Sequence, residues 1–133
     1  MKVETSKLTG AALDWAVAKC EELKSEGAEA VASRSVRLGI SPSLNWAVGG
    51  PIIEREQIAL DYYPDGGHEH GGMWMAHCLG LDGEGFYSAV EQDGPTPLIA
   101  AMRCFATSKL GEEVEIPEDL FDILQASRVS AGN

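Results

Sequence analysis

Apolar residues recur at helical spacing in two segments of the chain. In the first segment, which follows the N-cap residue Thr9, the apolar positions are Leu13, Ala16, Val17, Cys20 and Leu23. We predict a helix that starts after Thr9 and fades near Ser25. Its acidic residues are expected to face away from the apolar stripe: Asp14, Glu21 and Glu22.

The second helical segment follows Thr96 and has clear boundaries. Pro97 occupies the first helical position, where its missing N–H costs no hydrogen bond, and Gly111 supplies a C-terminal stop. The apolar stripe between them consists of Leu98, Ile99, Met102, Phe105, Ala106 and Leu110. A further helical turn or two is predicted from Pro117.

Strand-like segments lie between these helices. Residues 36–40 have strand propensity, and residues 73–79 alternate two sets of side chains as a strand does. A turn then leads into residues 86–90, so a β-hairpin is predicted. Residues 44–48 contain Trp46 and are bounded by turn residues on both sides. We expect them to form an edge strand or an ordered loop.

Together these elements predict an α+β fold with two to three helices packed on a small, mostly antiparallel sheet. Residues 28–34 fit a short helix or a loop, and a long glycine-rich loop is expected at residues 65–72. We interpret residues 1–126 as a single globular domain and residues 127–133 as a frayed C-terminal tail.

The charge of the chain is unevenly distributed. The 10 Lys and Arg stand against 21 Asp and Glu, which gives a net charge of −11 at pH 7. Residues 61–133 hold only three of the basic residues, and none occurs between Arg55 and Arg103. Because nucleic-acid backbones are bound by clustered Lys and Arg, we expect no direct binding of nucleic acid. The acidic stretch is interpreted either as a solvated surface or as a mimic of a polyanion such as DNA.

The expected location follows from two features that the sequence lacks. No apolar run is long enough to cross a bilayer, and the N-terminus lacks the apolar core of a secretory signal. We therefore expect a cytoplasmic protein without membrane contact.

The three cysteines, Cys20, Cys78 and Cys104, are odd in number and lie among apolar residues, so we interpret them as small buried hydrophobes.

Candidate catalytic chemistry is sparse. His68, Glu69, His70, His77 and Cys78 form a metal-binding candidate, but they lack a complete four-ligand pattern, and we expect no metal. The sequence has neither a nucleophile elbow nor a phosphate-binding loop. We therefore expect no catalytic residue, no cofactor and no enzymatic activity.

Two residues suggest molecular recognition. Arg103 lies among apolar residues, where a guanidinium needs an anionic partner. We favour an internal ion pair with Glu54, Asp14 or another acid of the first helix, because buried charges are normally paired within the fold; the alternative is a clamp for a ligand phosphate or carboxylate. Trp46 is expected either to stack on a planar ligand or to anchor its own segment in the core.

Three blocks of sequence carry a family resemblance. They are residues 8–18, which begin Leu-Thr-Gly-Ala-Ala-Leu-Asp-Trp, residues 41–54, which run from Ser-Pro-Ser to Gly-Gly-Pro-Ile-Ile-Glu, and residues 96–114, which begin Thr-Pro-Leu-Ile-Ala-Ala-Met-Arg. In this order they resemble the NinX-like small proteins of tailed bacteriophages and prophages, a family of unknown function. The resemblance implies a small accessory protein made in the bacterial cytoplasm during phage growth. The Gly- and His-rich residues 65–72 depart from the family pattern.

The polar and aromatic residues of these blocks form the candidate ligand-binding site: Asp14, Trp15, Trp46, Glu54, Thr96 and Arg103. We expect them to converge on a pocket between the two predicted helices and the Trp46 segment. Such a pocket favours a non-enzymatic protein that binds a small anionic or nucleotide-like molecule, such as a host defence signal. Arg103 would meet the anion, and Trp46 or Trp15 would stack on the base.

The alternative function is an acidic protein-protein inhibitor that mimics nucleic acid and targets a basic host protein. The acidic residues between Arg55 and Arg103 would supply its surface. Under either function, an apolar C-terminal helix on so small a domain favours a homodimer.

Overall fold

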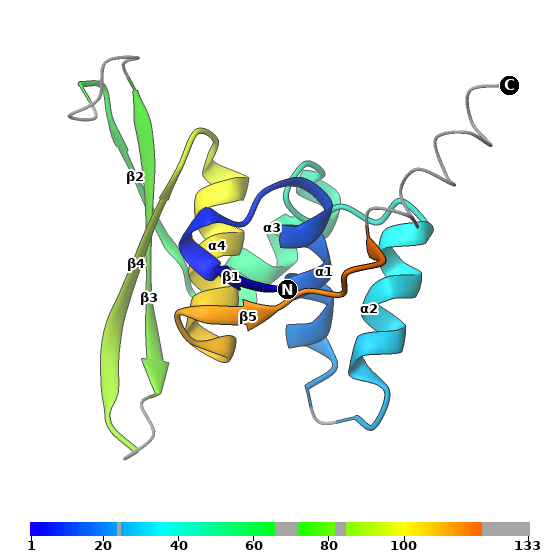
Figure 1. The fold of residues 1–133 in the computed structure, drawn as a ribbon. Helices are drawn as coiled ribbons and strands as arrows, with labels where there is room; N and C mark the ends of the chain where they lie inside the picture. The colour runs from blue at the N-terminus through cyan, green and yellow to red at the C-terminus, as the bar shows by residue number, and fades with distance from the viewer. Residues whose placement is uncertain (24, 66–71, 82–84, 121–133) are drawn as a thin grey trace, which may run out of the picture.

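The centre of the molecule is the helix α4 (Pro97–Leu110), which is buried on most of its surface. The computed structural model describes residues 1–23, 25–65, 72–81 and 85–120. Within them α4 packs against a three-stranded sheet on one side and against α1 (Gly10–Glu21) on the other (Figure 1). Its buried residues are Leu98, Ile99, Ala100, Ala101, Met102, Cys104, Phe105 and Ala106. A helix this apolar is stable only when other elements enclose it.

The three-stranded sheet has the order β2-β3-β4 and is antiparallel throughout. Its strands are β2 (Ala59–Tyr63), β3 (Met73–Leu81) and β4 (Tyr87–Gly94). A second, two-stranded antiparallel sheet pairs β1 (Lys2–Glu4) with β5 (Glu113–Glu115), and the one-turn helix η1 (Thr5–Lys7) follows β1. The predicted α+β class with a mostly antiparallel sheet is therefore confirmed.

The local signals at α4 and β3 produce the predicted structures. Thr96 caps α4 by accepting the Ile99 N–H at 3.1 Å, and Gly111 ends the helix with a positive φ of 86°. On β3, Cys78 points toward α4, whereas its neighbour His77 lies on the opposite face between two carboxylates. These two candidate metal ligands therefore cannot share one ion.

The helix α2 (Ala28–Arg37) corrects the predicted strand at residues 36–40. Val36 belongs to the last turn of α2 and is buried where α2 packs against α1. Its strand propensity is a weak preference, and burial of the side chain outweighs it. α1 itself begins after Thr9 as predicted, although Leu23 lies beyond its end and is 43% exposed.

The helix α3 (Trp46–Arg55) corrects the expectation for residues 44–48, which form neither an edge strand nor a loop. Asn45 starts this helix by accepting the Ala47 N–H at 3.0 Å. Gly49 lies inside the helix because the chain packs tightly there. A Cβ at this position would be 2.7 Å from Leu98 Cδ2 and in conflict with the Pro42 carbonyl oxygen.

Several predictions fall on residues outside the described ranges. They are the histidines of the loop at residues 65–72, the apolar positions beyond Leu120 that favoured a homodimer, the end of the domain at residue 126 and the tail at residues 127–133.

We predict that Gly49→Ala destabilises the fold by about 1 to 3 kcal/mol, because the added methyl overpacks the contact between α3, Pro42 and Leu98. Gly50→Ala is the matched control, since its Cβ would meet only Trp46 Cε3 at 3.9 Å. The control should be neutral or slightly stabilising, as alanine is the better helix former. Urea unfolding measures both, and equal effects would contradict this account of Gly49.

Candidate functional site

Arg103 connects three parts of the fold through backbone carbonyls. Its Nε donates to Leu8 O at 2.8 Å, just before α1, and its Nη1 donates to Asp93 O at 2.9 Å, near the end of β4. Burial lowers the pKa of Arg103, and the nearby Asp93 carboxylate opposes that shift. The favoured ion pair with Glu54 or Asp14 is wrong, because in the described structure the guanidinium satisfies carbonyl groups instead.

Asp14 also has an internal role. Its carboxylate accepts the Ser41 hydroxyl at 2.7 Å and the Ser43 N–H at 3.0 Å, and the residue is only 6% exposed. The expectation that Asp14 faces away from the core is therefore wrong. The carboxylate holds the turn that precedes α3 against α1, which explains why an acid interrupts the apolar face of a buried helix.

Trp15 and Thr96 serve the core and a helix end. Trp15 is fully buried, and its indole Nε1 donates to Ser33 Oγ at 3.1 Å across the α1–α2 contact. Thr96 uses its hydroxyl to cap α4. The indole of Trp15 is therefore enclosed, whereas Thr96 is exposed and uses its hydroxyl oxygen as a helix cap.

Trp46 and Glu54 are exposed members of the predicted set, as is Thr96. The first two lie on α3, and Trp46 is 54% exposed at the start of that helix. The expectation that Trp46 anchors its segment in the core is therefore not met. The structure thus places three of the six residues at the surface, namely Trp46, Glu54 and Thr96, and holds the other three in internal contacts.

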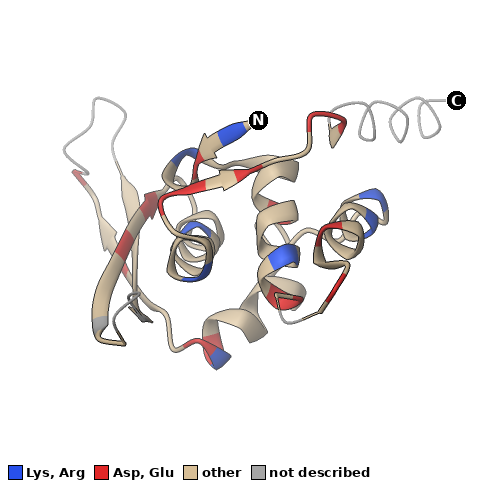
Figure 2. Ribbon diagram, turned by 60° about the horizontal axis from the view of Figure 1, so that its bottom comes forward, with Lys and Arg blue, Asp and Glu red and all other residues tan. Residues whose placement is uncertain are grey.

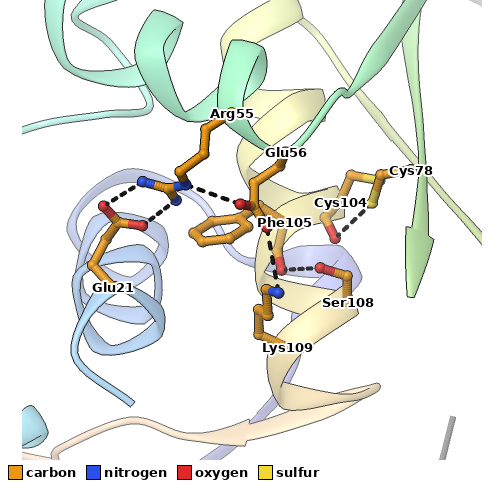
Figure 3. Close-up of polar contacts among 8 residues, drawn as sticks. All are labelled: Glu21, Arg55, Glu56, Cys78, Cys104, Phe105, Ser108 and Lys109. Atoms are coloured by element: carbon orange, nitrogen blue, oxygen red, sulfur yellow. Dashed lines mark hydrogen bonds and ion pairs between the residues drawn. The ribbon is translucent and has the colours of Figure 1, made fainter. Parts of the chain in front are cut away.

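A groove of about 230 Å³ lies between α1, α2 and α3. Its lining is mainly apolar, with Asp14, Glu21, Glu22 and Arg55 as its charged members. Arg55 is held by a bidentate contact to Glu21 and by Glu56 at 2.9 Å, and its guanidinium lies 5.7 Å from the Phe105 ring (Figure 3). These hydrogen bonds raise the pKa of Arg55. The arginine that lines this groove is therefore Arg55, whereas Arg103 was the arginine predicted to bind an anion in a pocket.

The second candidate site is the face of the three-stranded sheet that points away from α4. We call it the outer sheet face and define it by Asp61, Tyr63, Met75, His77, Leu79 and Glu91. Its orientation follows from β3, where Ala76, Cys78 and Gly80 are buried toward α4 and the alternate residues point outward. Leu79 is 68% and Tyr63 47% exposed.

His77 lies at the centre of the outer sheet face. Its Nε2 is 3.1 Å from Asp61 Oδ2 on β2, and its Nδ1 is 3.1 Å from Glu91 Oε1 on β4. The strand register places these three residues side by side. The sequence indicates the acidity of this stretch, but only the pairing of the strands shows which acids flank the histidine.

The sheet is entirely without strong cations. Residues 59–94 contain no Lys or Arg, and Figure 2 shows acidic segments on β2 and β4 and no basic segment on any of the three strands. On the helical side and at the small sheet, by contrast, cations pair with nearby acids, as in Lys2–Glu113, Lys19–Glu29 and Lys109–Glu56. The negative field is therefore concentrated on the sheet.

These features define a small acidic α+β protein with one uncovered sheet face. The family model described as bacteriophage P22, NinX, matches residues 4–109, which is more than half of the chain. The protein therefore belongs to the NinX family of phage proteins, and the predicted resemblance is confirmed. No curated protein matches the sequence. Within the described ranges, no helix has the length and apolar character needed to span a membrane.

We predict that Arg103→Ala lowers the free energy of unfolding by about 3 kcal/mol, since it leaves the carbonyls of Leu8 and Asp93 without their charged donor. Lys109→Ala is the control: it removes a half-exposed cation of the same helix, whose pair with Glu56 is worth about 0.5 kcal/mol. Chemical denaturation measures both. If the two variants lost the same stability, Arg103 would not have the connecting role given to it here.

Proposed function

We propose that this NinX-family protein is a non-enzymatic accessory protein of phage growth that binds a basic host protein in the bacterial cytoplasm. The contact would be made by the outer sheet face. The observation that carries the proposal is the placement of Asp61 and Glu91 among exposed apolar side chains on a sheet that has no Lys or Arg.

The composition of the outer sheet face suits a protein partner. Carboxylates attract a basic surface over several ångströms and set its orientation, while exposed groups such as Tyr63 and Leu79 supply area whose burial stabilises a complex. The strands themselves contribute no Lys or Arg that would weaken this attraction. Under this proposal, the outer sheet face would resemble nucleic acid in its negative charge.

The second candidate function is the binding of a small anionic or nucleotide-like ligand. It is supported by the exposed Trp46, which is available for stacking, and by Arg55 in the groove between α1, α2 and α3. Three acids share that groove with one arginine that already has two acidic partners. An anion would therefore meet a net negative lining, and for this reason we place the protein partner first.

The test compares two double variants with the same net charge. Asp61→Lys/Glu91→Lys reverses the outer sheet face, whereas Glu26→Lys/Glu118→Lys reverses two exposed acids elsewhere. Host proteins retained by the parent protein at low salt are identified by mass spectrometry, and the affinity of each purified basic protein is then measured. We expect the sheet variant to bind at least about tenfold more weakly, a loss of about 1.4 kcal/mol, and the control to bind nearly as the parent does.

Salt supplies a second criterion, because electrostatic association weakens as the Debye length falls from about 10 Å at 0.1 M salt to about 3 Å at 1 M. Equal binding by the two double variants, or binding indifferent to salt, would rule out the outer sheet face.

Calorimetry with nucleotides addresses the second function. Binding that is lost in Trp46→Ala but kept in the sheet variant would favour the small ligand instead.

A further inference from the structure

Two cysteine thiols meet between the sheet and the central helix. Cys78 on β3 and Cys104 on α4 lie with their Sγ atoms 3.0 Å apart (Figure 3). Both are free thiols, and this separation is about 1 Å longer than the bond of a disulfide. Twenty-six residues separate them along the chain, so the fold itself creates the pair.

The two thiols are not equivalent. Cys104 is fully buried and has a second acceptor for its S–H, the Val90 carbonyl at 3.3 Å, whereas Cys78 is 9% exposed. The hydrogen bond with Cys104 lowers the pKa of Cys78 to about 7, although burial acts in the opposite direction. The same hydrogen bond and burial raise the pKa of Cys104. Cys78 is thus the more acidic thiol of the pair and the one more readily ionised.

A groove approaches this pair from solvent. It has a volume of about 710 Å³ and is lined in part by Gly80, Val90 and Ser108. Gly80 lies two residues beyond Cys78 on the same face of β3, and Ser108 lies one helical turn beyond Cys104 on α4. The groove therefore brings a small neutral oxidant to Val90, which pairs with Cys78 across the strands and accepts the Cys104 S–H through its carbonyl.

We propose that Cys78 and Cys104 form a dithiol site that hydrogen peroxide oxidises to a disulfide linking β3 to α4. The Cys78 thiolate attacks one peroxide oxygen, the O–O bond breaks, and the released hydroxide takes up a proton to become water. Cys78 is then a sulfenic acid. The Cys104 sulfur attacks the Cys78 sulfur, and the sulfenic oxygen leaves with the Cys104 proton as a second water. Two thiols are oxidised and one peroxide is reduced.

Cys20 provides a control within the same chain. It is buried on α1, and burial together with the neighbouring Glu21 raises its pKa to about 12. A thiol that stays protonated is a poor nucleophile. Peroxide should therefore distinguish the pair from Cys20 in the folded protein.

The experiment treats the reduced, folded full chain with hydrogen peroxide at neutral pH and follows intact mass and free thiols, with peptide mapping of the product. We expect the loss of two hydrogen atoms, a peptide that links Cys78 to Cys104, an unmodified Cys20, and reversal by dithiothreitol. Cys20→Ala should behave as the parent. Cys104→Ser should stop at a Cys78 sulfenic acid that dimedone traps, and Cys78→Ser should react at least tenfold more slowly than the parent.

The parent and Cys20→Ala decide the question even if the other variants fail to fold, and circular dichroism verifies the folded state of each. Oxidation of Cys20 as fast as that of the pair would overturn the proposal. A disulfide formed between two molecules, or higher oxidation of Cys78 in the parent without any link to Cys104, would overturn it as well.

Discussion

The structure depends on the enclosure of α4 between the sheet and α1. On the sheet side this requires close approach, and a small residue provides it at the end of β4, where a Cβ on Gly94 would be 2.7 Å from Ala100 N of α4. Arg103 is the charged residue within this buried stretch, and its donors satisfy carbonyls on both sides of the helix. The layers are thereby joined by hydrogen bonds as well as by apolar packing.

The sequence predicts the fold where local sequence signals and tertiary packing favour the same structure. The cap, first-position proline and terminal glycine of α4 coincide with a buried helix, and the alternation on β3 coincides with one covered face. The local signal is misleading at Gly49. Glycine there suggests a turn, but the residue lies within α3 and allows the helix to pack closely against Pro42 and Leu98. Single-residue signals cannot show which of these two uses of glycine applies, because the contacting residues are distant in the sequence.

The same reasoning explains why the predicted site is only partly present. Asp14, Trp15 and Arg103 are polar or partly polar groups in mainly apolar surroundings, which fits a ligand site and an internally satisfied core equally well. The partners that decide between these readings, such as Ser43 N–H or Leu8 O, leave no mark on the sequence, because every residue has a backbone. Conversely, the setting of His77 depends on strand register, which the alternation alone does not fix.

The two faces of the sheet are under different constraints. The face on α4 is buried at Ala76, Cys78 and Gly80, and it brings Cys78 against Cys104 with their Sγ atoms 3.0 Å apart. The outer sheet face has no such packing to satisfy within the described chain, yet it carries carboxylates on its two outer strands, β2 and β4, and the sheet has no Lys or Arg to neutralise them. The two carboxylates do not face each other directly, because β3 separates their strands and His77 lies 3.1 Å from each of them. The proposed basic partner would give these partly exposed acids a role that the core-facing side of the sheet does not have.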